Sequence, residues 1–267
     1  MFKTVVSIFL SFFILSACNN RQGDQPVSGV ETVAPDKEKA LLDSTLQFPD
    51  SLLLKERLIQ YYREKDDYAK AISTTDGFLK TDSLNARLWE IKGNLYFEDL
   101  DTVKAIRCFE TALQLSPTAN YLMQLASLYA KAKDKKALFA ADVLQEKFKG
   151  TEREAFYIRG LYHTYTGDKP TAIELFDKCL QFDYNYMPAY LEKAIAFYDQ
   201  AKYEEALKVL DKAVTLQNKF DEGYFWKGRC LEKLNRPDEA IEEYRTALLY
   251  SPDYTDAKDA LERLHAK

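Results

Sequence analysis

The chain has 267 residues, of which 46% are hydrophobic and 30% are charged, a balance that favours a folded helical protein over a disordered one. Its nine glycines and eight prolines are few for a β-rich protein of this length. The formal net charge of −5 argues against a nucleic-acid binder, because neutralising phosphates needs a concentrated basic surface.

Residues 1–17 have the pattern of a secretory leader. Lys3 precedes an apolar run over residues 5–15, which is shorter than the roughly 20 residues that a bilayer span needs. The run ends in Leu-Ser-Ala followed by Cys18, which resembles the bacterial lipoprotein box. The resemblance implies cleavage before Cys18 and attachment of lipid, such as palmitate, to this residue. The alternative is an ordinary leader with an incidental cysteine.

The segment after the leader, residues 18–36, predicts a flexible tether. It is polar, it contains glycine and proline, and it shows no periodic apolar pattern. Asn19 stands where many lipoproteins that stay in the inner membrane have aspartate, so the resemblance favours the outer membrane. We therefore expect a lipid-anchored protein of the bacterial envelope. The sequence does not indicate whether it faces the periplasm or the cell surface.

The remaining chain predicts a succession of short amphipathic helices. Residues 37–51 can form a capping helix, which Pro49 ends, because proline lacks an N–H and clashes with the preceding turn. Six units of similar length are expected to follow, at 52–85, 86–117, 118–152, 153–186, 187–220 and 221–254. An amphipathic segment at 255–267 resembles the helix that shields the last unit of such arrays from solvent.

The repeat is clearest in residues 153–254, which divide into three units of equal length without a gap. Aromatic residues recur at the fourth position of each unit, small residues at the eighth and alanine at the twentieth: Phe156, Tyr190 and Tyr224; Gly160, Ala194 and Gly228; Ala172, Ala206 and Ala240. Each unit has two stretches of helical periodicity. One unit cannot bury its own apolar face, so a fixed period of this kind predicts helix pairs that stack.

These residues resemble the tetratricopeptide repeat. The last unit supplies the residues that the family has at its fixed positions, Tyr224, Gly228, Leu231, Ala240, Tyr244, Ala247 and Pro252. It departs at Lys227, where the family has leucine, and the unit at 153 departs at His163, where the family has tyrosine. The resemblance implies an all-α protein, a right-handed α-solenoid of about six helix-turn-helix units with a C-terminal capping helix. It also implies a protein or peptide partner.

In this family the first helix of each unit lines the concave face, which is the expected partner groove. In units four to six those positions gather aromatic and aliphatic residues, here called the groove set: Tyr157, Ile158, Leu161, Tyr165, Leu191, Ile195, Tyr198, Phe225 and Trp226. Contiguous exposed apolar residues usually mark a binding site, and tyrosine and tryptophan dominate interface hot spots. The family's clamp for peptide carboxylates is not carried over, because its positions hold Glu90, Tyr157 and Leu191.

Three interpretations of the groove set remain open. The leading one is a scaffold or adaptor that holds a protein partner near the envelope without catalysis. A glycan-binding lipoprotein is the second, with Tyr157, Tyr198 and Trp226 as platforms for sugar rings beside carboxylates such as Glu222 or Asp199. The third is a self-associating structural subunit. Packing against neighbouring helices could also cover part of the set.

The sequence contains no motif that argues for an enzyme. Metal-ligand spacings, phosphate-binding loops and dinucleotide glycine patterns are absent, so no cofactor or metal is expected. Besides Cys18, the cysteines are Cys108, Cys179 and Cys230, which we expect to be free and mostly buried. A nucleophilic pair of Cys179 with His163 is possible in principle, but both occupy ordinary packing positions.

Overall fold

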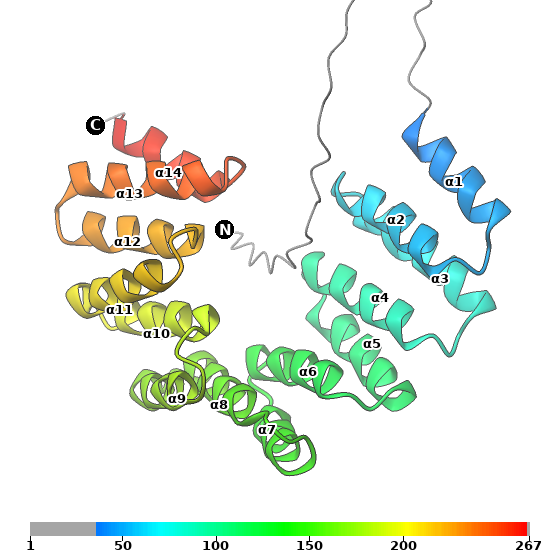
Figure 1. Ribbon diagram of the computed structural model, residues 1–267, viewed down its shortest axis with the longest axis horizontal. Coiled ribbons are helices and arrows are strands. Elements are labelled where there is room, and N and C mark those ends of the chain that lie inside the picture. The colour runs from blue at the N-terminus through cyan, green and yellow to red at the C-terminus, as the bar shows by residue number, and fades with distance from the viewer. Residues whose placement is uncertain (1–35, 266–267) are drawn as a thin grey trace, which may run out of the picture. The chain divides into compact units, whose positions relative to one another are not determined.

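The computed structural model describes residues 36–265. The expected leader, Cys18 and the tether up to residue 35 lie outside the described residues. Within the described range the protein is all-α, with fourteen helices and no strand. The helices are α1 Lys37–Gln47, α2 Leu52–Arg63, α3 Tyr68–Thr81, α4 Ala86–Glu98, α5 Thr102–Leu115, α6 Ala119–Lys131, α7 Lys136–Lys147, α8 Glu152–Thr166, α9 Lys169–Phe182, α10 Met187–Asp199, α11 Tyr203–Leu216, α12 Asp221–Lys233, α13 Pro237–Tyr250 and α14 Thr255–His265 (Figure 1).

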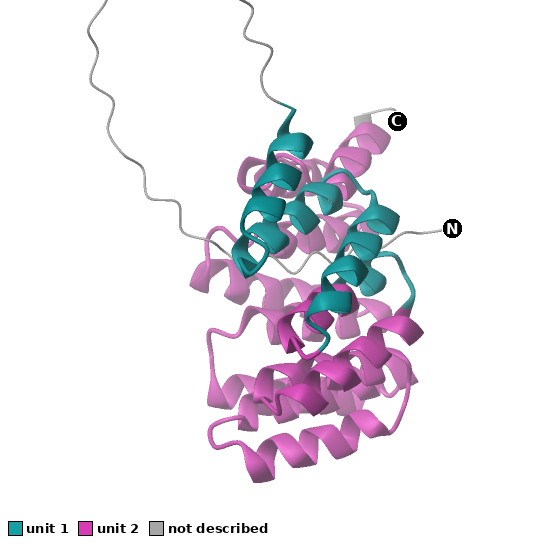
Figure 2. Cartoon of the chain, turned by 90° about the vertical axis from the view of Figure 1, so that its right-hand side faces the viewer, with its two compact units in different colours: residues 1–83, 94–101 teal, residues 84–93, 102–267 magenta. Residues whose placement is uncertain are grey.

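The helices form two compact bodies that divide within α4. The first body holds α1 to α3 and residues 94–101, and the second holds residues 84–93 and everything from residue 102 onward (Figure 2). In the second body, consecutive helices pack as pairs, and each pair packs against the next, from α6 to α14 (Figure 1). This arrangement is the α-solenoid of helix-turn-helix units that the repeat period predicts.

The helix ends follow from local sequence signals. The side chain of Asp67 accepts a hydrogen bond from the Lys70 N–H at 3.0 Å, and that of Asp168 accepts one from the Thr171 N–H at 3.3 Å. These N-caps satisfy amide groups that have no partner in the first turn of α3 and α9. A proline stands in the first turn of α9, α10 and α13, where its missing N–H costs nothing.

The core of each unit is a close crossing of its two helices. A Cβ atom added at Gly228 of α12 would lie 2.6 Å from Cε1 of Tyr244 in α13, and one added at Gly160 of α8 would lie 2.5 Å from Cε1 of Phe176 in α9. Tyr244 and Phe176 are fully buried. The small residue at the eighth position of a unit therefore lets a large ring of the second helix pack directly on the backbone of the first.

Candidate partner-binding surface

The structure divides the groove set into exposed and buried members. Tyr157, Tyr165, Leu191, Ile195, Tyr198 and Trp226 are partly exposed on α8, α10 and α12. Ile158, Leu161 and Phe225 are 0%, 6% and 7% exposed, so they support the surface and do not line it. The expectation that all nine face a partner therefore has to be corrected for these three residues.

Phe225 shows the physical reason for the correction. Its ring lies 5.7 Å from that of Tyr244 in α13 and 4.9 Å from that of Tyr254, which precedes α14, measured between ring centroids. The sequence of α12 places Phe225 on the groove-facing side of the helix, but the next helix and the turn beyond it cover the ring. Both covering residues belong to the same unit, 221–254, so the position of a residue on the first helix does not indicate whether the rest of the unit covers it.

The exposed aromatic residues of α10 and α12 form one cluster. The rings of Tyr198 and Trp226 lie 5.4 Å apart and nearly perpendicular, at 80°. The guanidinium of Arg229 lies over both rings, 5.0 Å from the centroid of Tyr198 and 4.5 Å from that of Trp226. Arginine stacked on aromatic rings is attracted by their negative faces and fixes their positions.

Sequence reasoning missed Arg229, although a signal was present. Arg229 stands three residues after Trp226 in α12, one helical turn further along the same face. The groove set contains only apolar and aromatic side chains, so it leaves out a cation whose stem and guanidinium complete the aromatic cluster.

At the α8 end, the tyrosines of the surface are neutral. The ring of Tyr157 contacts those of Tyr186, at 5.2 Å, and Phe176, at 5.9 Å. Burial raises the pKa of Tyr157 well above its usual value and raises the pKa of Tyr165 to about 12. Both hydroxyls keep their protons over the physiological range, so these residues contribute apolar rings and hydrogen-bonding groups but no charge.

Two carboxyl groups also belong to this surface, Glu192 on α10 and Glu222 on α12. Burial raises the pKa of each to about 7. The causes of these two pKa shifts are burial and nearby charges, and no hydrogen bond to another residue contributes to either shift. A partly buried carboxyl without such a bond is costly to ionise, and groups of this kind cluster at functional sites.

The surroundings of Glu192 mix both charges. After burial, the strongest influence on its pKa is Lys169, which lowers it, while Asp199 and Glu222 raise it and Lys131 lowers it. Lys169 is itself bound to Asp199, with 2.5 Å between the Lys169 Nζ and Asp199 Oδ2 atoms. Burial therefore outweighs the attraction of Lys169, which is already paired with Asp199, and holds the pKa of Glu192 at about 7.

The cysteines of the described residues are buried, and His163 contacts a carboxylate. Cys108, Cys179 and Cys230 are buried and form no disulfide within the described residues, which confirms the sequence prediction. Burial raises the pKa of the Cys179 thiol to about 12, so it carries no thiolate at neutral pH. His163 instead contacts Asp168, with its Nδ1 atom 3.2 Å from Oδ2. No cluster of three metal-ligating side chains occurs in the described part of the chain.

The comparisons with known proteins agree with this fold. Residues 191–254 match the tetratricopeptide repeat family model. A tetratricopeptide repeat protein from Parabacteroides merdae is 18% identical, with a TM-score of 0.67 over 85% of this chain and 91% of that one. A thermophilic tetratricopeptide repeat protein from Thermus thermophilus is 17% identical, with a TM-score of 0.58 over 68% of this chain and 100% of that one. Residues 191–254 thus carry tetratricopeptide repeats, and the described chain has the fold of these solved tetratricopeptide repeat proteins.

A relative found by sequence is a longer protein. The DnaJ homolog subfamily C member 7 homolog of Schizosaccharomyces pombe is 22% identical over 241 residues, covering 89% of this chain and 46% of that protein. The chain thus spans about half the length of this relative. Tetratricopeptide arrays present extended concave surfaces that bind protein or peptide segments, so the fold supports a protein-interaction scaffold. Within residues 36–265 no helix has both the length and the apolar content that a bilayer crossing requires.

Proposed function

We propose that this protein is a lipid-anchored scaffold of the bacterial cell envelope, which binds a segment of a partner protein on the surface formed by α8, α10 and α12. Cys18 is the lipid attachment site in this proposal, and the outer membrane is the proposed location. The protein itself performs no catalysis. Its role is to hold the partner close to the membrane within reach of the tether.

The observation that carries the proposal is the partly exposed apolar surface on three consecutive first helices. Tyr157, Leu191, Ile195 and Trp226 are each only partly covered by their own fold. Arg229 braces the Tyr198–Trp226 cluster, so its aromatic side chains are ordered before a partner arrives. Preorganised aromatic anchors lower the entropy cost of binding, which favours their use as interface hot spots.

The same cluster favours a peptide over a glycan. Sugar rings stack on flat, open aromatic faces, whereas Tyr198 and Trp226 stand perpendicular to each other and share a guanidinium over their faces. Self-association through this surface would instead make a symmetric interface. Light scattering of the purified protein separates that case, because only self-association doubles the mass in the absence of a partner.

The groove is tested by affinity capture from crosslinked envelopes, comparing the native protein with Ile195→Ser/Trp226→Ala. The matched control is Phe139→Ala/Phe182→Ala, which removes two aromatic side chains that are 70% and 57% exposed on α7 and α9. We expect the groove variant to lose the captured partner at least tenfold and the control to keep it. Equal capture by all three proteins, with unchanged helicity, would contradict the proposal.

The lipid anchor has its own test. Cells fed with radiolabelled palmitate should label the native protein and not Cys18→Ser, and the variant should leave the membrane fraction. Labelling of the Cys18→Ser protein would place the lipid elsewhere, and absence of label from the native protein would remove the anchor from the proposal.

A further inference from the structure

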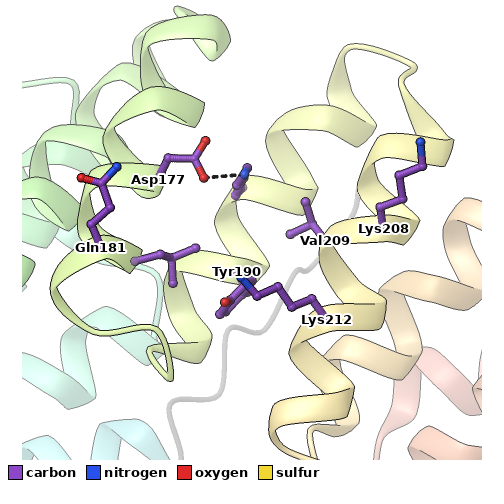
Figure 3. Close-up of a pocket in the computed structure, with 8 residues that line it drawn as sticks. Asp177, Gln181, Tyr190, Lys208, Val209 and Lys212 are labelled. Carbon is purple, nitrogen blue, oxygen red and sulfur yellow. Dashed lines mark hydrogen bonds and ion pairs between the residues drawn. The ribbon is translucent and has the colours of Figure 1, made fainter.

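A second recess lies on residues that the groove set does not include. It is a pocket of about 500 Å³ formed by α9, α10 and α11, and its lining residues are Asp177, Leu180, Gln181, Tyr190, Lys193, Lys208, Val209 and Lys212 (Figure 3). The lining carries three lysines and one aspartate, so the pocket is positive inside a protein whose net charge is −5. The pocket shares no residue with the groove set, so a test of the pocket and a test of the groove can give different results.

The next junction of the array lies between α11, α12 and α13, one repeat further along the chain. There the protein's own side chains supply the partners that the pocket lacks. Lys227 on α12 is placed there as Lys193 is placed on α10. Its Nζ atom lies 3.0 Å from Asp211 Oδ1 and 2.7 Å from Glu243 Oε1. One largely buried lysine is therefore held between two carboxylates, one from each flanking helix.

In the pocket itself, Lys193 contacts one carboxylate where Lys227 contacts two. The Lys193 Nζ atom lies 2.5 Å from Asp177 Oδ1, which corresponds to the Lys227–Asp211 pair, and the dashed line in Figure 3 marks this contact. The residue that corresponds to Glu243 is Val209, which cannot accept a hydrogen bond. The side chains of Lys193 and Lys227 are 16% and 14% exposed, so the two cations are similarly desolvated but unequally neutralised.

A tyrosine hydroxyl in the same pocket also lacks a partner. Tyr190 is 2% exposed, and its Oη atom is buried without a hydrogen bond to any residue that the structure describes. Tyr224, which corresponds to it in the next unit, donates a hydrogen bond to the Asn218 carbonyl at 3.1 Å. A buried hydroxyl without an acceptor has lost its hydrogen bonds to water, so an incoming acceptor at Tyr190 would relieve that cost.

The remaining lysines add positive charge where the corresponding residues of the next junction carry none. Lys212 reaches over the ring of Tyr190, with its Nζ atom 5.5 Å from the ring centroid, and Lys208 stands one turn before it on α11 (Figure 3). The corresponding residues one repeat later are Thr246 and Glu242. The pocket therefore combines an excess of donors, an unpaired hydroxyl and an apolar side chain where the next junction has an acceptor.

We propose that this pocket binds the carboxylate of an aspartate or glutamate side chain of a partner protein, with Lys193, Lys212 and the Tyr190 hydroxyl as donors. The carboxylate would occupy the place that Glu243 fills one repeat later. That correspondence selects a carboxylate, because the filled junction already shows one in contact with an equivalent lysine. Charge-assisted hydrogen bonds of this kind are about twice as strong as neutral ones.

The test is a methyl NMR titration of the purified protein with two blocked peptides, acetyl-Glu-Glu-Glu-amide and its Gln counterpart. We expect saturable shifts of the Leu180 methyl groups with the Glu peptide and none with the Gln peptide. Val209→Glu should weaken binding at least tenfold, because it supplies the internal carboxylate that the next junction contains. Lys208→Gln/Lys212→Gln, at two exposed positions, should weaken it as well without unfolding the protein.

Two controls make the result decisive. Val103→Glu adds the same charge at a site on α5 that is 64% exposed, and it should bind the Glu peptide as the native protein does. Inorganic phosphate is the competing probe. Equal Leu180 shifts with both peptides, a Val209→Glu protein that binds as tightly as the native one, or shifts with phosphate alone would each overturn the carboxylate assignment.

Discussion

At the scale of single residues, the two side chains that meet at a helix crossing have a similar combined volume in every unit. Where the residue on the first helix is small, the residue on the second helix is large, and the reverse. Glycine faces a ring in three units, at Gly228 with Tyr244, Gly160 with Phe176 and Gly93 with Phe109. The other units use Ala194 with Leu210, Leu125 with Ala141 and Ile59 with Thr75, at the same spacing along the chain and all buried. The sequence pattern of any one unit looks degenerate, but the paired positions fill the same space.

The crossing predicts opposite effects for two similar substitutions. Gly228→Ala places a methyl group 2.6 Å from Tyr244, which cannot move because it is buried and donates to Glu232 at 2.6 Å. We expect a loss of about 1–3 kcal/mol in the free energy of unfolding. Gly77→Ala, with nothing within 4 Å of the new atom, should gain about 0.5–1 kcal/mol.

Chemical denaturation of both variants measures the difference. The double variant Gly228→Ala/Tyr244→Leu reproduces the Ala194–Leu210 pair of the preceding unit, so it should recover part of the loss. Destabilisation by Gly77→Ala as large as that by Gly228→Ala would contradict the close crossing as the cause of the loss at Gly228.

The two partly buried carboxyls of the groove, Glu192 and Glu222, make stability depend on pH. The pKa values of Glu192 and Glu222 rise from 4.5 to about 7 on folding, so between these pH values the folded protein holds protons that the unfolded chain releases. Their contribution is present below about pH 4.5 and is lost as the pH rises to about 7. We expect a fall of roughly 1–3 kcal/mol per carboxyl, since one pKa unit equals about 1.36 kcal/mol and partial exposure reduces the effect.

Urea unfolding at pH 5 and pH 8 checks this expectation. Glu192→Gln/Glu222→Gln should flatten the dependence, while Glu205→Gln, on the exposed side of α11, should leave it unchanged. The pKa of Asp168 and of Asp183 is lowered, chiefly by hydrogen bonds to Thr171 and Arg153 respectively, so their stabilisation is lost only in stronger acid. A native protein that is equally stable at both pH values would contradict the raised pKa values.

At the scale of the element, one left-handed residue lies in the turn between the two helices of every unit. These residues are Asp66, Leu100, Lys133, Gly167, Ala201 and Asn235, with φ between 57° and 94°, and they recur at the same place in successive units. Only one of them is glycine. A residue with a Cβ atom costs roughly 1 kcal/mol in this region, so the chain tolerates strain at several turns to keep the helix pair closed.

This turn conformation predicts opposite changes in stability for two substitutions. Ala201→Gly should raise the free energy of unfolding by about 1 kcal/mol, because Ala201 is exposed and strained only by its backbone conformation. Gly167→Ala should lower it by a similar amount, although nothing lies within 4 Å of the added Cβ atom. Thermal melting of both proteins measures the two shifts. Melting temperatures that fall in both variants would mean that the left-handed conformation is not the cause.

At the scale of the whole molecule, the sequence predicted the fold better than the site. A fixed repeat period with small and aromatic residues at set positions was enough for the helix pairs, because each pair buries residues that its own unit supplies. The exposure of the site residues, in contrast, depends on side chains outside their own helix. Tyr244 of α13 and Tyr254 beyond it cover Phe225, and burial raises the pKa of Glu192 to about 7, and neither outcome can be inferred from the sequence of α12 or α10 alone.

The central claim is that α8, α10 and α12 contact a partner protein, and site-specific photo-crosslinking in intact cells tests it most directly. A photoreactive residue replaces Ile195, which is partly exposed in the groove, or Phe139, which is 70% exposed on α7. We predict a discrete crosslinked product from position 195, lost with Trp226→Ala, and none from position 139. The same products from both positions, or none from position 195, would contradict the account.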